Sequence, residues 1–102
     1  MAIPGWTWDE DTYDGFAVES MADASATFAV LADETRLEIL AALAARSPLS
    51  YADLQTATGV TDNGRLNYHL RQLRPTFVTE DGDGYALTGR GRAVVDTALP
   101  DR

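Results

Sequence analysis

Two short helical segments separated by a glycine-containing turn constrain the fold of this chain most strongly. Ser50 and Asp53 have the spacing of a capping box and predict the start of a first short helix, which Gly59 ends. Asp62 predicts the N-cap of a second helix over residues 62–73. Leucines at i, i+4 and i+7 give this helix an apolar face, formed by Leu66, Leu70 and Leu73. Two short helices joined by such a turn are typical of a helix-turn-helix.

The residues after this pair of helices alternate in the manner of a β-hairpin. Pro75 prevents the second helix from continuing, and residues 81–84, Asp-Gly-Asp-Gly, predict a tight turn. The residues expected in the two strands are Phe77, Val78, Tyr85 and Leu87. A last helix, capped by Thr88, is expected after the hairpin.

Two further helices are expected before the helix-turn-helix. The first begins near Ser20, and Asp33 caps the second, which runs from Glu34 to about Ala45. The apolar stripe of the first helix consists of Met21, Ala24, Phe28 and Leu31. The inner face expected of the second helix is Leu37, Leu40, Ala41 and Ala44, and the last helix carries Ala93, Val94 and Ala98.

This order of elements predicts a mainly α winged helix-turn-helix with about five helices and a two-stranded wing. We expect the domain to occupy residues 20–102. Residues 1–19 combine acids, a proline and glycines without a helical period, and they predict an acidic N-terminal arm. The arm also contains aromatic residues, which favour contact with the domain, a second subunit or a protein partner. An unpacked tail is the alternative.

The absence of cysteine removes disulfides, thiolate nucleophiles and cysteine metal sites. His69 is the single histidine, so a closed zinc site is disfavoured, and we interpret it as a packing residue beside the leucine face. No catalytic motif is visible, so neither an enzyme nor a bound cofactor is expected. The longest apolar stretch is too short to cross a bilayer, and the acidic N-terminus is unlike a signal peptide. These features predict a cytoplasmic protein.

Charge is the unusual property of the composition. Aspartate and glutamate number 16 against 8 basic residues, and every base is arginine. Hydrated carboxylates without lysine side chains suit a protein that stays soluble where molar salt screens charges within ~3 Å. We therefore predict adaptation to a high-salt cytoplasm. An ordinary acidic protein that lacks lysine by chance is the alternative.

Two segments carry a resemblance to a known family. Residues 28–40, FAVLADETRLEIL, resemble the second helix of the ArsR-type winged-helix regulators, and residues 67–73, NYHLRQL, resemble their recognition helix. The variant of these motifs is similar to haloarchaeal members, and the match extends from Phe28 to about Val95. The resemblance implies a homodimeric transcription regulator that pairs through its terminal helices and binds double-stranded DNA. The metal ligands of the family's sensors are missing, and the wing turn is acidic instead of basic.

The polar side of the helix over residues 62–73 is the candidate DNA-contact surface. On a helical wheel its outward arc holds Gly64, Asn67, Tyr68 and Arg71, flanked by Arg65 and Gln72. An Asn can pair with adenine and an Arg with guanine or phosphate, and a glycine permits close approach to bases. Additional candidate DNA-binding residues are Asn63, Arg74 and Arg90. Asn63 has the alternative role of supporting the helix start, and Arg90 that of pairing with nearby acids.

Charge is segregated along the chain in a way that favours DNA binding. Between Arg65 and Arg92 there are five arginines and three acids, whereas residues 1–40 hold nine acids and one arginine. Such clustering of bases is expected of a nucleic-acid-binding face. The alternatives are a winged helix that acts as a protein-protein interaction module and a polar helix face that is merely solvated.

Overall fold

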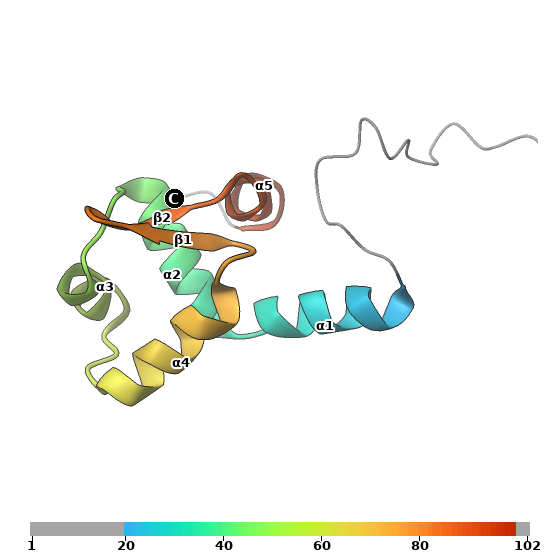
Figure 1. Cartoon of the computed structure of the whole chain (residues 1–102), viewed down its shortest axis with the longest axis horizontal. Coiled ribbons are helices and arrows are strands. Elements are labelled where there is room, and N and C mark those ends of the chain that lie inside the picture. Colours follow the sequence, from blue (N-terminus) through green and yellow to red (C-terminus); the bar gives the residue numbers. More distant parts are fainter. Residues whose placement is uncertain (1–19, 100–102) are drawn as a thin grey trace, which may run out of the picture.

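The computed structural model describes residues 20–99 as five helices and one hairpin (Figure 1). The elements, in chain order, are α1 (Met21–Leu31), α2 (Glu34–Ala45), α3 (Tyr51–Thr58), α4 (Asn63–Leu73), β1 (Val78–Asp81), β2 (Gly84–Leu87) and α5 (Gly89–Ala98). Helices α3 and α4 form the helix-turn-helix, and β1 and β2 form the wing. The predicted fold class, a mainly α winged helix-turn-helix, is confirmed. The predicted arm, residues 1–19, and residues 100–102 lie outside the described part of the chain.

Side-chain caps set the starts of all five helices. In each case the side chain of the N-cap residue accepts a hydrogen bond from the backbone N–H three residues later. These N-caps are Ser20, Asp33, Ser50, Asp62 and Thr88. The predicted capping box is confirmed, because the Asp53 carboxylate also accepts from the Ser50 N–H at 3.2 Å. Gly59 ends α3 with a φ of 74°, a conformation that favours glycine.

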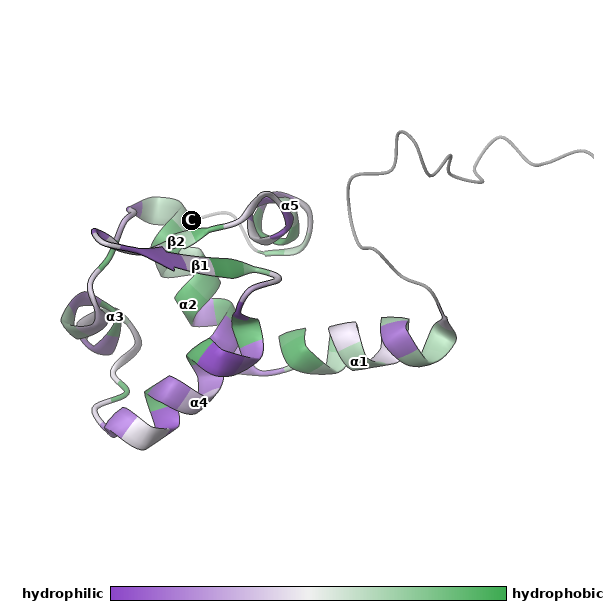
Figure 2. Ribbon diagram, viewed as in Figure 1, coloured by the Kyte–Doolittle hydropathy of each residue, from purple (hydrophilic) through white to green (hydrophobic). Residues whose placement is uncertain are grey.

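Helix α1 packs less tightly than its sequence pattern predicts. It contacts the α2 region, yet none of its residues is buried, and Met21 and Phe28 are 88% and 59% exposed. Figure 2 shows α1 extending away from the rest of the domain. Of the predicted apolar stripe, Leu31 packs partly against the core, whereas Met21 and Phe28 are in contact with solvent in the single chain.

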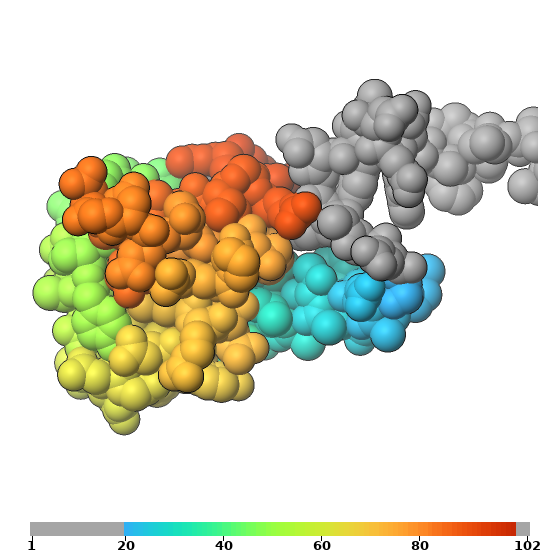
Figure 3. Space-filling view, in the orientation of Figure 1, coloured from blue at the N-terminus to red at the C-terminus, as the bar shows by residue number. Residues whose placement is uncertain are grey.

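The hairpin is antiparallel, with Val78 opposite Leu87 and Asp81 opposite Gly84. In the space-filling view the hairpin and α4 are both visible on one face of the molecule (Figure 3). Leu49 adds a short bridge to Tyr85 through two hydrogen bonds of 3.0 and 2.8 Å. Gly84 has a φ of 131°, and a Cβ there would lie 2.5 Å from the Leu49 oxygen, so this close approach requires glycine.

Phe77, which was predicted in the first strand, lies just before β1. Its N–H donates to the carbonyl of Leu73 at 2.8 Å, and its own carbonyl accepts from the N–H of Thr88 at 3.0 Å. These bonds use the backbone of Phe77 to join the end of α4 to the start of α5. The strand begins one residue later, and the Phe77 side chain is buried in the core.

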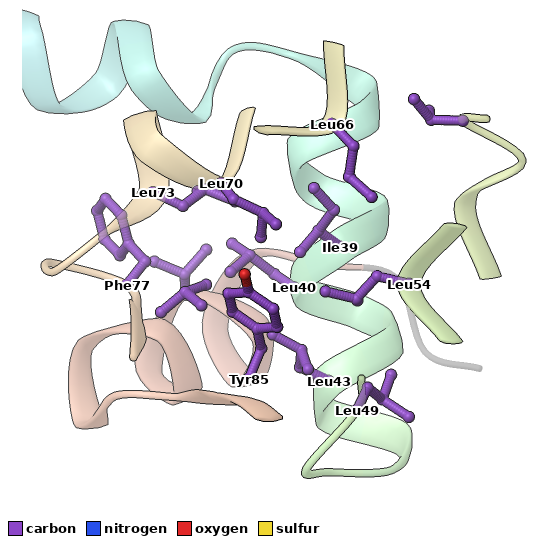
Figure 4. Close-up of a cluster of buried hydrophobic side chains, with 13 residues drawn as sticks. Ile39, Leu40, Leu43, Leu49, Leu54, Leu66, Leu70, Leu73, Phe77 and Tyr85 are labelled. Atoms are coloured by element: carbon purple, nitrogen blue, oxygen red, sulfur yellow. The ribbon is translucent and has the colours of Figure 1, made fainter. Parts of the chain in front are cut away.

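Helix α2 lies at the centre of the core and packs against α3, α4, α5 and β2 (Figure 4). The leucine face of α4 packs into the same cluster, as predicted. The predicted inner face of α2 is partly wrong. Ile39 and Leu43 are fully buried, whereas Leu37 and Ala44 are only partly buried. A helix surrounded by four elements buries more than one stripe, so a single-face pattern underestimates its core.

Helix α5 covers the core with only part of its apolar residues. Of the three named from the sequence, Val94 is buried, whereas Ala93 and Ala98 are exposed. Gly91 and Val94 form the buried side, and Val95 packs partly against the core. Gly91 lets α5 approach the backbone of Phe77 closely, because a Cβ at this position would overlap the Phe77 carbonyl oxygen.

Candidate nucleic-acid interface

Helix α4 has one buried side and one exposed side. Its buried residues are Leu66, His69, Leu70 and Leu73. The exposed residues of the helix are Asn63, Gly64, Arg65, Asn67, Tyr68, Arg71 and Gln72. The helical wheel predicts this division correctly. None of the exposed residues is acidic, so the exposed face of α4, defined by these seven residues, carries only polar, aromatic and cationic groups.

Asn63 fixes the turn between α3 and α4. Its side-chain Oδ1 accepts a hydrogen bond of 2.8 Å from Gln55 Nε2, and its backbone carbonyl accepts one of 2.8 Å from the Tyr51 hydroxyl. Gln55 also donates to the Thr61 carbonyl at 3.3 Å. The structure therefore supports the alternative role of Asn63, in which it supports the helix start. Its predicted contact with DNA would use only groups that these bonds leave available.

Asn67 and Arg71 lie one turn apart on the exposed face. No hydrogen bond or ion pair joins either side chain to another residue in the part of the chain that the structure describes. Residues four positions apart on a helix project in nearly the same direction. The amide of Asn67 and the guanidinium of Arg71 are thus adjacent and available to an external ligand.

Arg65 and Arg74 lie toward the two ends of α4 and have partners. Arg65 donates to the Thr35 hydroxyl at the start of α2 at 3.4 Å. Arg74, the C-cap residue, pairs with Glu80 of β1 at 3.1 Å and lies 6.0 Å from the centre of the Tyr85 ring. The pair with Glu80 is about 40% exposed on both sides, and such surface pairs are weak. Both cations can exchange these partners for phosphate at little cost.

Arg90 does not belong to the same surface as the residues of α4. It lies in the first turn of α5 and is partly buried. Figure 1 places α5 and α4 on opposite sides of the hairpin. The structure therefore brings eight of the nine predicted contact residues together on or at the end of α4, and it separates Arg90 from them.

A buried arginine lies directly beneath the exposed face. Arg36, in the first turn of α2, is 8% exposed and donates through Nε to Nδ1 of His69 at 3.0 Å. A second guanidinium nitrogen donates to the Val30 carbonyl of α1 at 2.9 Å. The guanidinium carbon also lies 5.4 Å from the centre of the Tyr68 ring, a cation–π distance. Arg36 therefore joins α1, α2 and α4.

His69 is buried and accepts a hydrogen bond through Nδ1, which requires the neutral imidazole with its proton on Nε2. Burial and the charges of Arg36 and Arg65 lower the pKa of His69 below its ordinary value of 6.5, whereas the Asp33 carboxylate, 4.0 Å from Nδ1, opposes this change. The interpretation of His69 as a packing residue is confirmed, with the added role of hydrogen-bond acceptor.

The role of Arg36 was not predicted from the sequence. A usable signal was present, because Arg36 precedes Leu40 by four residues and Leu43 by seven, which places it on the apolar face of α2. A charged residue at a core position indicates a buried partner. Its partner His69 is 33 residues away in sequence, and no local pattern connects the two.

The hairpin has the opposite charge to α4. Glu80, Asp81 and Asp83 are all exposed. The Asp81 carboxylate accepts a hydrogen bond of 2.7 Å from the Asp83 N–H, which stabilises the turn. The tip of the wing therefore presents carboxylates, and it lacks the cations that a phosphate contact needs.

Residues 20–99 contain no group of three or more histidine, cysteine, aspartate or glutamate side chains arranged to hold a metal ion. Across the same residues, no helix has the length and apolar character needed to cross a lipid bilayer.

A family model described as a domain of unknown function (DUF7347) matches residues 24–98. The match begins within α1 and ends with the last residue of α5, so it covers most of α1 and all of the later helices and strands. No curated protein matches the chain, and no solved structure matches it.

Proposed function

The chain belongs to the DUF7347 family of domains of unknown function, and from the geometry of α4 we propose that it is a sequence-specific DNA-binding transcription regulator. In this proposal α4 enters the major groove of double-stranded DNA, which admits an α-helix. The observation that carries the proposal is the exposed face of α4. This face has no acidic residue in a chain whose acids outnumber its bases 16 to 8.

Asn67 and Arg71 are the proposed base-contacting residues. A free Asn amide can donate and accept together at N6 and N7 of adenine, and a free guanidinium can bind O6 and N7 of guanine or a phosphate. Tyr68 and Gln72 flank this pair on the exposed face and are proposed to contact bases or backbone. Arg65 and Arg74, near the two ends of the helix, are proposed to bind phosphates, which fix the register of a protein on the duplex.

Gly64 supports the proposal because the fold itself gives no reason for a glycine there. Its φ is not positive, and a Cβ would make only an ordinary contact, 3.4 Å from a carboxylate oxygen of Asp62. Glycine within a helix lowers stability relative to alanine by up to about 1 kcal/mol. A glycine on the exposed face of α4 is explained if its missing side chain lets the helix approach the edges of bases.

We further propose that the regulator acts as a homodimer through its terminal helices. Exposed Met21 and Phe28 on α1 support this, since large exposed apolar side chains mark interaction surfaces. Two-fold DNA sites also require two copies of α4. Sedimentation in molar salt is expected to show a dimer at micromolar concentration. A monomer that binds DNA with full affinity would contradict this part of the proposal.

The resemblance of residues 28–40 and 67–73 to ArsR-type regulators agrees with this function. The acidic, lysine-free composition favours a cytoplasm of high salt concentration as the working environment. In such a medium the counterion release that normally drives DNA binding is weak, so hydrogen bonds from α4 to bases must contribute more of the affinity.

A protein-protein interaction module is the second candidate function. The exposed carboxylates at the tip of the hairpin favour it, because a typical wing binds phosphate through cations. In that case the hairpin or α1 would bind a protein partner, and α4 would have no base-reading role.

Selection from a randomised double-stranded DNA library in molar KCl tests the proposed function. The parent protein is expected to enrich one motif, and Asn67→Ala is expected to bind this motif about 1 to 3 kcal/mol more weakly and to relax preference at one position. Gln55→Ala serves as a control, because it alters the α3–α4 turn without removing a group from the exposed face. Failure of the parent to enrich any motif would contradict the proposal.

A further inference from the structure

Arg36 is a charged side chain placed in the interior, and its three contacts come from two other helices. It is 8% exposed, and a cation is costly to bury unless its donors are satisfied. One guanidinium nitrogen donates to the Val30 carbonyl, in the last turn of α1, where helix carbonyls lack intrahelical partners. Nε donates to His69 on the inner side of α4. Both acceptors lie away from the exposed face, and the carboxylate of Asp33 also interacts electrostatically with Arg36.

The third contact lies on the exposed face of α4. The Tyr68 ring is 51% exposed, and its centre is 5.4 Å from the guanidinium carbon of Arg36. The Tyr68 ring also packs against the His69 ring, with ring centres 5.6 Å apart and planes inclined at 61°. The ring is thus held from within the protein by two groups of one hydrogen-bonded pair, while about half of its surface faces solvent.

From this arrangement we infer that Arg36 is a positioning residue for base recognition, which holds the Tyr68 ring in one orientation on the exposed face of α4. The inference rests on the proposed DNA-binding function. An ordered ring adjoining Asn67 and Arg71 loses little conformational freedom on binding, and it limits which base can lie against it. Arg36 has no access to DNA itself, so its effect on sequence preference passes through Tyr68.

The guanidinium is needed because it donates in two directions while its central carbon lies 5.4 Å from the centre of the Tyr68 ring. A lysine ammonium has the same charge, but it lacks the planar fork. Arg36→Lys therefore keeps the positive charge and removes the planar arrangement of hydrogen-bond donors. Tyr68→Phe keeps the ring, and Tyr68→Leu removes it. Ile39→Val, at a fully buried position on the same helix, is a control that lowers stability without altering the cation or the ring.

The experiment compares binding to a duplex selected by the parent with binding to a shuffled duplex of the same composition, under conditions in which every variant is folded. Arg36→Lys is expected to lower the ratio of the two affinities about tenfold, with binding to the shuffled duplex changed less than about twofold. Ile39→Val, at equal loss of stability, is expected to leave the ratio unchanged. The Arg36→Lys effect should persist with Tyr68→Phe and disappear with Tyr68→Leu, because coupled residues are not additive.

A second readout needs no DNA. In the free protein, Arg36→Lys is expected to shift the NMR signals of the Tyr68 ring, and Ile39→Val is expected to leave them in place. Two results would overturn the positioning role while leaving DNA binding intact. One is an equal fall in the affinity ratio for Arg36→Lys and Ile39→Val. The other is that the effects of Arg36→Lys and Tyr68→Leu are additive. If the parent itself fails to distinguish the two duplexes, the proposed function fails, and the role of Arg36 in recognition fails with it.

Discussion

The exposed face of α4 and the tip of the hairpin belong to one small winged helix, and both are visible on the same face of the molecule (Figure 3), yet their charges are opposite. Helix α4 presents Arg65 and Arg71 with no acid, whereas the hairpin presents Glu80, Asp81 and Asp83. The difference indicates that the two elements cannot contact a polyanion in the same way. We propose that α4 binds DNA, and that the carboxylates of the hairpin weaken this binding because they repel phosphates and take up cations.

The Arg74–Glu80 ion pair links these two regions. It joins the C-cap of α4 to β1 at 3.1 Å, and it keeps one cation of the helix close to the acidic strand. Charge reversal on α4 and charge removal on the hairpin therefore test separately what each region contributes to DNA binding.

The largest expected effect comes from Arg71→Glu. This substitution places an acid at the centre of the exposed face, where no described residue pairs with the arginine, so the fold should be little affected. Loss of a contact and new repulsion from phosphate should together weaken binding to the selected duplex by about 100-fold. Fluorescence anisotropy measures the affinity. Arg92→Glu, at an exposed position on α5, is the control and should bind like the parent; similar losses in both variants would remove the distinction between α4 and the remaining surface.

Gly64→Ala is expected to have a smaller effect, in which the stability of the fold rises and the affinity for DNA falls. The alanine should stabilise α4 by up to about 1 kcal/mol, because glycine is a poor helix former and the added Cβ makes only an ordinary contact with Asp62. The same methyl group should weaken binding to the selected duplex about tenfold by separating the helix from the bases. Urea unfolding and a DNA titration measure the two quantities. A more stable variant with unchanged DNA affinity would show that α4 does not approach the bases at this position.

Neutralising the hairpin tip should have a weaker effect in the opposite direction. Asp81→Asn with Asp83→Asn keeps an oxygen at residue 81 to accept from the residue 83 N–H, so the turn should persist. DNA affinity is expected to rise a few-fold, and the slope of log affinity against log salt should become steeper by up to about 2, because fewer cations are taken up on binding. An unchanged slope would mean that the hairpin lies far from the duplex.

The smallest expected effect concerns stability in mild acid. Because the pKa of His69 is lowered in the folded chain, the unfolded chain takes up the proton first as pH falls. The contribution of neutral His69 to stability is complete above about pH 6.5 and is lost as pH falls through the lowered pKa. Nearby Asp33 limits the loss. Urea unfolding at pH 7.5 and at pH 5.5 measures this loss, and His69→Gln should reduce the difference in the free energy of unfolding between the two pH values. Greater stability at pH 5.5 would contradict this reasoning.

Local signals in the sequence were sufficient to predict α4 and its two sides. Asp62 caps the helix, and three leucines at regular spacing define the buried side, so the exposed residues follow from geometry alone. The turn chemistry of Gly59 and the hairpin was equally local. These elements were predictable because their determinants lie within a few residues of one another.

The parts that were not predictable depend on contacts between distant segments. The apolar stripe of α1 has a correct helical period, but its period does not tell whether a neighbour exists to cover it, and Met21 remains 88% exposed. The bond between Arg36 and His69 spans 33 residues. The separation of Arg90 from α4 likewise depends on how α5 packs against α2 and β2, which no local pattern specifies.

An NMR titration of the isotope-labelled chain with the selected duplex shows which surface of the protein contacts DNA. We expect the largest shifts in the exposed face of α4, including the side-chain signals of Asn67 and Arg71, with smaller shifts at the hairpin tip. The side-chain signals of Asn67 and Arg71 should stop shifting at the same point of the titration, at one duplex half-site per protein chain. Shifts confined to α1 or to the acidic hairpin, with α4 unchanged at saturation, would contradict the claim that α4 reads DNA.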